Sequence, residues 1–281
     1  MKTWKKIVLG VSLISLFLGG GLVAWGYSQG GLTDLQNKTI SEQDYVKKEV
    51  KDFNKIDIKS SSYNVLIKNG EVDKATLSYY QKTKNPIDTS VKDGQLTIND
   101  NNSELDSTSN KHINFFGLKD LVRLSTLNKE VRNKTIVITL PKKQTIDFLK
   151  VDLATGNLDL SNSTIKQADI NLNVGDLTFT KMIVSNLKAN LDVGSVDSDH
   201  TLFTNSDLSI AMGDYSGDNL IFNGHNKLDV TSGDIEIALS DYTLNVQADS
   251  HSGEVDITNN LKISKDNTLT ITSDLGDITV E

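Results

Sequence analysis

The chain has 281 residues, 37% of them hydrophobic and 23% charged, which suits one large domain or two small ones. Its formal net charge is −8 and the body of the chain has no basic patch, so a general role in nucleic-acid binding is disfavoured. The absence of cysteine excludes disulfides, thiolate catalysis and cysteine-ligated metal sites.

The N-terminus predicts a membrane anchor. Residues 1–6 form a short basic head, and residues 7–27 contain no charge. A helix of that length spans roughly 30 Å, the thickness of the hydrocarbon core of a lipid bilayer. The lysines before the span predict a cytoplasmic head and an extracellular C-terminal domain. The alternative is a cleaved signal peptide, but its apolar region is usually only about 7–15 residues long and ends in a small-x-small site.

The next stretches predict a linker and then an irregular β region. Residues 28–52 are polar and indicate an extracellular linker. The domain itself is predicted over 53–281, with a less regular first part over 53–150. Within that part, an insertion over 101–130 contains residues 113–127, whose apolar residues have helix-like spacing and predict a short covering helix or a contact with lipid or protein. The expected strands lie at 53–58, 65–67, 75–82, 89–100 (with an Asp93-Gly94 hairpin turn) and 134–143.

Residues 151–281 repeat at a nearly constant interval. Each copy begins with a glycine followed by a polar residue and an apolar one, as in SGDIEI and SGEVDI. These structural repeat glycines are Gly156, Gly175, Gly194, Gly213, Gly233, Gly253 and Gly276. Successive gaps of 19, 19, 19, 20, 20 and 23 residues indicate a repeat architecture.

Apolar residues alternate with polar ones on both sides of each glycine, which is typical of two half-buried strands joined at a corner. A unit of about 20 residues with one apolar face cannot enclose a core alone, so neighbouring units must stack. The sequence therefore predicts an all-β fold, a single-stranded parallel β-solenoid that follows the transmembrane helix. The last unit, which ends at Glu281, has no evident cap, so we expect its edge to be available for pairing with another copy.

FNKIDIKSSSYNVLIKNG, VITLPKKQTIDFLKVDLATGNLDL and the glycine repeats resemble the bacterial putative-adhesin family, a domain of unknown function built from β-strand repeats. The resemblance covers about residues 50–281, although the insertion over 101–130 departs from the plainest family pattern. It implies a β-solenoid outside a bacterial, Gram-positive cell, where members are linked to adhesion or envelope stress. The family supplies no catalytic motif.

The residue after each repeat glycine is often acidic, so a solenoid would stack these carboxylates in one column. The preferred interpretation is a solvated corner, where aspartate and asparagine suit the turn. A calcium ion bridging Asp214, Asp234 and Glu254 is the alternative. The four histidines fall at unrelated positions in the repeat, and both arginines, Arg123 and Arg132, lie outside the glycine repeats. We therefore expect no catalytic site, no cofactor and no metal.

The resulting hypothesis is a membrane-anchored, extracellular, non-enzymatic β-solenoid for binding or structural work at the cell envelope. Its expected partners are the lipid bilayer, through residues 7–27, and a cell-wall or capsule polymer or an envelope protein. One alternative is a regulatory partner of another membrane protein in envelope stress. A remote alternative is a polysaccharide-acting β-helix enzyme. The ligand, the hand of the solenoid and the oligomeric state stay open.

Overall fold

The computed structural model describes residues 43–82, 86–100 and 134–281. The chain divides into two compact units, Met1–Gln43 and Asp44–Glu281, and nearly all described residues belong to the second. In the described ranges every regular element is a β-strand. The predicted anchor over 7–27 and the insertion over 101–130 lie outside the described residues.

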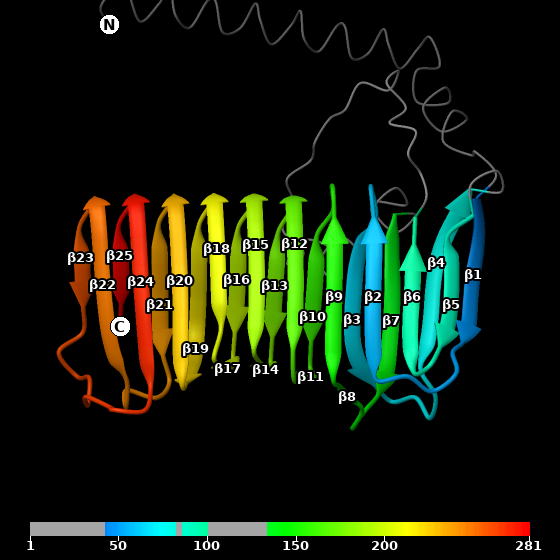
Figure 1. Cartoon of the computed structure of the whole chain (residues 1–281), viewed down its shortest axis with the longest axis horizontal. Coiled ribbons are helices and arrows are strands. Elements are labelled where there is room, and N and C mark those ends of the chain that lie inside the picture. The colour runs from blue at the N-terminus through cyan, green and yellow to red at the C-terminus, as the bar shows by residue number, and fades with distance from the viewer. Residues whose placement is uncertain (1–42, 83–85, 101–133) are drawn as a thin grey trace, which may run out of the picture. The chain divides into compact units, whose positions relative to one another are not determined.

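The strands form two sheets. The ten-stranded one, here called the broad sheet, lies in front in Figure 1 and has the order β22 (Asn245–Ser252), β24 (Thr268–Leu275), β20 (His225–Ser232), β18 (Asp207–Met212), β15 (Leu187–Val193), β12 (Ala168–Val174), β9 (Phe148–Leu153), β2 (Lys55–Ser60), β6 (Gln95–Asn99) and β5 (Asp88–Lys92).

The fifteen-stranded sheet has a long arm behind the broad sheet, here called the opposite sheet, and a narrow arm, here called the short face. The opposite sheet has the order β1 (Gln43–Glu49), β4 (Thr76–Lys82), β7 (Thr135–Pro141), β3 (Asn64–Gly70), β10 (Leu158–Ser161), β13 (Leu177–Thr180), β16 (Val196–Asp199), β19 (Tyr215–Asn223), β21 (Ile235–Leu239), β25 (Ile278–Val280) and β23 (Val255–Ile257). The short face contains β8 (Thr145–Ile146), β11 (Thr164–Ile165), β14 (Ile183–Ser185), β17 (Leu202–Thr204) and the end of β19.

One coil comprises a broad-sheet strand, a glycine corner, an opposite-sheet strand and a short-face strand. The chain runs from β12 through Gly175 to β13, then β14, and returns to the broad sheet as β15. Because β12 and β15 pair in parallel and in register, equivalent residues of successive coils lie side by side. The prediction of an all-β, largely parallel, solenoid-like fold is confirmed.

The alternating residues point inward as the sequence indicates. The residue two positions after each repeat glycine is buried in every coil except the one with Val255. The residues five positions before the glycine are likewise buried, apart from Ala248, which is partly exposed. Most of the aliphatic side chains therefore share one core between the sheets.

The repeat glycines lie where the chain turns from the broad sheet into the opposite sheet. At Gly194, φ is 147°, a conformation that residues with a Cβ rarely adopt. A Cβ added there would lie 2.0 Å from the carbonyl oxygen of Gly175 in the preceding coil. The corner therefore requires glycine for its conformation and for the close stacking of successive backbones.

The coils do not stack in sequence order at the C-terminal end. The strand β24 pairs with β20 on one side and β22 on the other, and β25 lies between β21 and β23. The coil containing Gly276 is thus inserted between the coils containing Gly233 and Gly253. The expectation of a free edge at Glu281 was wrong, because the last strand is paired on both sides; the free edge belongs to β22 and β23.

The N-terminal end has the same inversion. The strands β2 and β3 lie between the coil of β6 and β7 and the coil of β9 and β10. This end contains two antiparallel pairings, β5 with β6 and β4 with β7, and its terminal strands are β5 and β1. The predicted hairpin turn is present, with positive φ at Asp93 and Gly94. The strand β1 forms from residues that the sequence analysis had assigned to the linker over 28–52.

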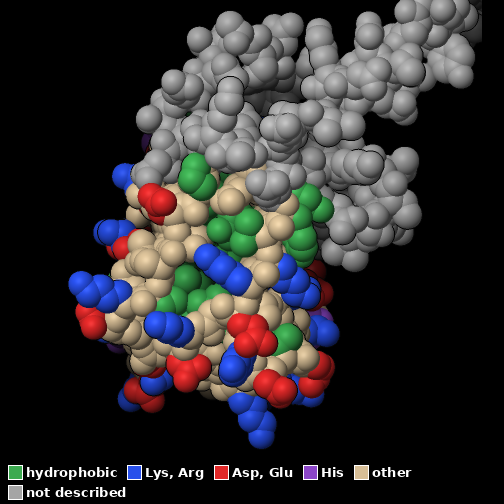
Figure 2. Space-filling view, turned by 90° about the vertical axis from the view of Figure 1, so that its right-hand side faces the viewer, with side chains coloured by type: hydrophobic (Ala, Val, Ile, Leu, Met, Phe, Trp, Pro, Cys, Tyr) green, Lys and Arg blue, Asp and Glu red, His purple; other side chains and the backbone are tan. Residues whose placement is uncertain are grey.

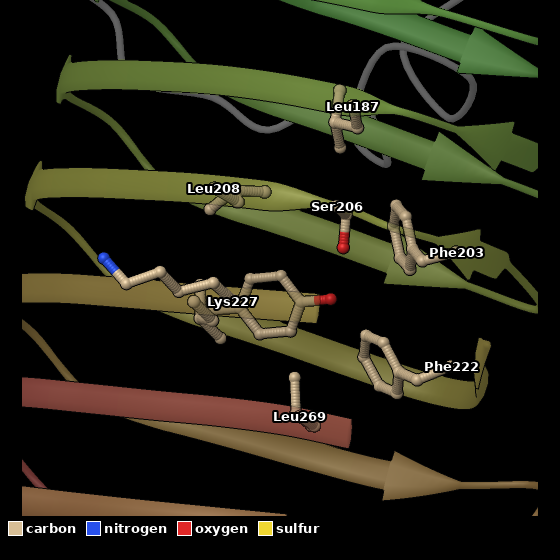
Figure 3. Close-up of a pocket in the computed structure, with 9 residues that line it drawn as sticks. Leu187, Phe203, Ser206, Leu208, Phe222, Lys227 and Leu269 are labelled. Atoms are coloured by element: carbon tan, nitrogen blue, oxygen red, sulfur yellow. The ribbon is translucent and has the colours of Figure 1, made fainter. Parts of the chain in front are cut away.

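The core is filled by side chains from both sheets. Phe179, Phe203 and Phe222 come from successive coils, and their ring centroids are 5.3 and 5.8 Å apart. The gap drawn in Figure 3 has a volume of about 10 Å³, room for about one water molecule. A gap of this size cannot accept a sugar or peptide.

Substitution of one buried residue, Ser273, is expected to stabilise the fold. The hydroxyl of Ser273 is buried, and it is the one buried side-chain oxygen or nitrogen in the described ranges without a hydrogen-bond partner. We expect Ser273→Ala to raise the free energy of unfolding by about 1 kcal/mol, since a buried unpaired polar group costs roughly that much. Chemical denaturation measures the change.

The matched control is Ser198→Ala, because Ser198 is also buried but accepts a hydrogen bond from the Tyr215 hydroxyl at 3.3 Å. That substitution should lower the free energy of unfolding by about 1 kcal/mol. Equal losses for the two variants would contradict the assignment of Ser273 as unpaired.

Candidate binding faces

The outer surface of the broad sheet contains a column of alternating charge. Six neighbouring strands each contribute one residue to it, and these residues, paired in register, are alternately an acid and a lysine. This charged column consists of Asp57, Lys150, Asp169, Lys188, Asp207 and Lys227. Because neighbouring strands are about 4.8 Å apart, like charges recur at roughly 9.6 Å along the face.

The members of the charged column form no ion pairs with one another among the described residues. Of the six, Lys227 alone has an ion pair among the described residues, and its partner Asp229 lies in the adjacent column. The hydrogen bond to the Asp229 carboxylate raises the pKa of Lys227. Lys150 and Lys188 are exposed, so their ammonium groups are available to a ligand.

A second column beside the first is mostly uncharged at its centre. Asn190 donates a side-chain hydrogen bond to the Asn171 side-chain oxygen at 2.9 Å, and Ser209 follows in register. Such stacked amides hold the side chains at fixed positions. The broad sheet therefore presents charges and amides at a constant spacing.

The opposite sheet has a different outer column, in which acids alternate with hydroxyls. Its members in spatial order are Asp159, Thr178, Asp197, Ser216, Glu236, Thr279 and Asp256. Burial raises the pKa of Asp159 to about 6, and the nearby Lys68 opposes that shift. Asp159 differs from Asp197 in having an apolar neighbour in register, Leu66.

This shift predicts a pH-dependent stability. The pKa of Asp159 is higher in the folded state (about 6) than in an unfolded chain (about 3.9), so the folded state binds the proton more tightly. Stability should therefore fall as pH rises from about 4 to 6. We expect Asp159→Asn to raise the free energy of unfolding by about 1–2 kcal/mol at pH 7.5, after allowing for the partly exposed side chain, and to bring no gain near pH 4.

Denaturation at several pH values measures this difference. Asp197→Asn, in the same column but beside Thr178 and Ser216, is the control and should change the free energy of unfolding little at pH 7.5, because it lies on the outer surface between polar neighbours. A gain for Asp159→Asn that stays constant from pH 4 to 7.5 would contradict burial as its cause.

The polar residues after the repeat glycines form a hydrogen-bonded series, here called the corner ladder. The backbone N–H of each member donates to the side-chain oxygen of its neighbour in the adjacent coil, as Asp234 does to Asp214 at 2.9 Å. The series begins at Asn64, which follows Tyr63 and contributes only its side-chain oxygen as an acceptor. It continues through Asn157, Asp176, Ser195, Asp214, Asp234, Asp277 and Glu254. The acids at the corners thus satisfy backbone donors, which spacing alone did not reveal.

The calcium alternative named Asp214, Asp234 and Glu254, and these three residues are not consecutive in the corner ladder. Asp277 lies between Asp234 and Glu254, because the coil of Gly276 is inserted there. Within the described ranges, no group of three or more acids or histidines is arranged to hold a metal ion.

The short face contains a shallow, open hollow of about 310 Å³. Its lining includes Ile183, Leu202 and Ile221, which lie in register in successive coils, and also Lys181 and His200. His200 contacts Asp199 at 2.6 Å, whereas His225 lies on the broad sheet beside Thr268. The structure therefore does not bring these two histidines together.

These features define a class of protein: a solenoid-like stack of largely parallel strands around one apolar core. The chain belongs to the Toastrack DUF4097 family, whose model matches residues 53–281. That match covers the stretch on which the resemblance to putative adhesins rested. In the described parts of the chain, no helix has the length and hydrophobicity needed to span a membrane.

Solved structures of low sequence identity are similar to the chain. A putative cell adhesion protein from Clostridium sporogenes is 17% identical (85% of this chain and 99% of that chain covered, TM-score 0.37). A putative adhesin from Bacteroides fragilis is 15% identical (85% and 97%, TM-score 0.39). A putative lipid binding protein from Parabacteroides distasonis is 12% identical (86% and 98%, TM-score 0.33). No match was found among curated proteins.

Proposed function

We propose that the protein is a membrane-anchored, extracellular, non-enzymatic β-solenoid that binds a repetitive polymer of the cell envelope through the broad sheet. The observation that carries this proposal is the charged column, whose like charges recur at roughly 9.6 Å on a rigid face. A rigid periodic face suits many weak contacts, which add up when the ligand repeats as well.

The anchor is part of this proposal. The uncharged stretch over 7–27 is long enough to cross a bilayer, and the lysines before it favour a cytoplasmic N-terminus. The domain over 53–281 then faces the cell wall or capsule, with residues 28–42 as a tether. Polymer binding there requires no catalytic group, and the similarity to putative adhesins is in keeping with it.

The test is a binding screen of the purified full chain against peptidoglycan, teichoic acids, capsule polysaccharides and envelope proteins. The face variant combines Asp169→Asn with Lys188→Gln, which neutralises two central members of the charged column without changing net charge. The control combines Asp266→Asn with Lys262→Gln at exposed positions between β23 and β24.

We expect at least one charged polymer to bind the wild type and the control, and the face variant to bind it about tenfold more weakly. Equal binding by both variants would contradict the role of the broad sheet. Release of sugar products from any polymer would favour an enzyme instead.

A further inference from the structure

The end of the stack formed by β22 and β23, here called the free edge, is open in both sheets. Among the described residues β22 pairs only with β24, and β23 only with β25. Val255 is 41% exposed although Ile235 and Ile278, its equivalents in neighbouring coils, are buried. The free edge thus combines unpaired strand edges with an incompletely covered end of the core.

The other end of the stack is protected. Its terminal strands are β5 in the broad sheet and β1 in the opposite sheet, and they contain three lysines, Lys92, Lys47 and Lys48. Figure 2 views this end and shows basic and acidic side chains around small apolar patches. Charged residues on edge strands, lysine above all, discourage pairing with another chain, whereas β22 contains no lysine, arginine or proline and one acid, Asp249. The two ends therefore differ in their capacity to accept a strand.

We propose that the free edge binds the free edge of a second copy of this chain. A two-fold axis perpendicular to the broad sheet would place β22 antiparallel to its counterpart and extend the broad sheet across both copies. The same axis would pair β23 with its counterpart, since the opposite sheet lies behind the broad sheet (Figure 1). One contact would then satisfy both open edges and cover both exposed core ends.

Side-chain chemistry indicates the register of this contact. On the outward side of β22, Asp249 and His251 are two residues apart and exposed. An antiparallel pair centred on Ser250 places each Asp249 opposite the His251 of the other copy. On β23 the corresponding centre is Asp256, because Ser250 and Asp256 lie three residues before and after Gly253.

Two consequences follow for β23. Val255 of one copy then lies opposite Ile257 of the other, on the inward side, so each covers apolar surface of its partner. The two Asp256 carboxylates face each other on the outer surface and repel. Removal of that charge should therefore strengthen the contact, an effect that damage to the fold would not produce.

The arrangement also suggests a biological setting, and this step rests on the proposed membrane anchor. The chain enters the described unit at β1, at the end opposite the free edge. Ten broad-sheet strands at about 4.8 Å place β22 roughly 43 Å from β5. A pair joined at its free edges has its two tethers at opposite ends, which suits copies in two facing membranes.

The first test uses the absence of cysteine in the chain. Asp256→Cys in the purified full chain places a thiol on the proposed two-fold axis, and mild oxidation should yield a covalent dimer. Thr279→Cys is the matched control, because Thr279 lies outward on β25, in register with Asp256 but one strand away from the free edge. Its thiol should stay reduced. Equal dimer yields, or none from Asp256→Cys, would overturn the proposal.

The second test measures self-association of the full chain in detergent by sedimentation. Asp256→Asn should strengthen it about threefold by removing the like-charge contact. Val255→Lys, which places a charge at the edge of the core, should weaken it about tenfold with little loss of thermal stability, since Val255 is already partly exposed. Unchanged association in both variants would overturn the contact.

A third measurement separates pairing from the proposed envelope role. Two vesicle populations that contain the full chain should cluster, and Val255→Lys should abolish clustering. If covalent dimers form but vesicles do not cluster, the free edge pairs with a second copy, but that pairing does not link membranes. Loss of polymer binding in the face variant, measured separately, concerns the broad sheet alone.

Discussion

Gly194→Ala is expected to lower the free energy of unfolding by more than about 4 kcal/mol, enough to prevent folding in most conditions. The added Cβ would lie 2.0 Å from the carbonyl oxygen of Gly175, and both are held by backbone pairing, so neither can move away without separating two coils. The φ of 147° at Gly194 adds conformational strain for any residue with a Cβ. Circular dichroism and chemical denaturation measure the loss.

Thr178→Ala is the matched control for this substitution. Thr178 lies on the outer surface of β13, in the adjacent coil, and its side chain is partly exposed. We expect a loss within about 0.5 kcal/mol, as for most surface positions. A comparable loss at Gly194 and Thr178 would show that successive backbones do not approach closely at the corners.

Ile235→Asp is expected to lower the free energy of unfolding by several kcal/mol. Ile235 is 1% exposed and lies in register between Tyr215 and Ile278, both buried. A carboxylate there would be removed from water, and the hydroxyl of the neighbouring Tyr215 already donates to Ser198, so the acid would stay in the core only if protonated. Thermal and chemical denaturation measure the effect, which should be smaller at acid pH.

Asp234→Ser, one residue away, should cost less than about 1 kcal/mol. The Asp234 carboxylate accepts the backbone N–H of Asp277 at 2.9 Å, and serine can do the same. Ser195 already occupies an equivalent position, where its hydroxyl accepts the N–H of Asp214 at 3.3 Å. If both substitutions were equally damaging, the inward and outward assignments along β21 would be wrong.

The coil itself could be predicted from the sequence because its determinants are local. The glycine interval fixes the length of a coil, and the alternation of apolar residues around Gly156 or Gly175 decides which side chains point inward. Register between neighbours follows, since a shift by one residue would expose every aliphatic side chain of a strand. The hairpin at Asp93 and Gly94 could be predicted for the same reason, because the Asp-Gly pair is itself a turn signal.

The stacking order could not be predicted, because the inward pattern of one coil is compatible with any other coil as neighbour. The pattern around Gly276 fits beside Gly233 or beside Gly253 equally well. One departure in the sequence indicated a change, namely the 23-residue gap between Gly253 and Gly276 after gaps of 19 or 20. The residues in that gap connect β23 to β24 and allow the chain to return past its own last coil.

The candidate binding faces depend only in part on that order, because most of the charged column lies in coils that stack in sequence order. Lys150, Asp169, Lys188, Asp207 and Lys227 recur at the repeat interval of 19 or 20 residues, so their alternation could have been found in the sequence. The position of Asp57 in the column requires β2 to lie beside β9. The corner ladder was expected as a column of acids, yet its role in binding backbone N–H groups requires the geometry of the corner. The repeat spacing predicts the positions of the corner residues, but it does not predict their hydrogen bonds.

The most direct test of the coil order uses engineered cysteine pairs on the outer surface of the broad sheet. Asp229 pairs in register with Thr272, and Thr272 with Asp249, so Asp229 and Asp249 lie two strands apart. Neighbouring strands satisfy the Cα separation of a disulfide, about 4.4–6.8 Å, whereas a separation of two strands does not. The inserted order predicts a disulfide in Asp229→Cys with Thr272→Cys and none in Asp229→Cys with Asp249→Cys. A disulfide in the second pair only would mean that the coils stack in sequence order, and would contradict the inserted coil.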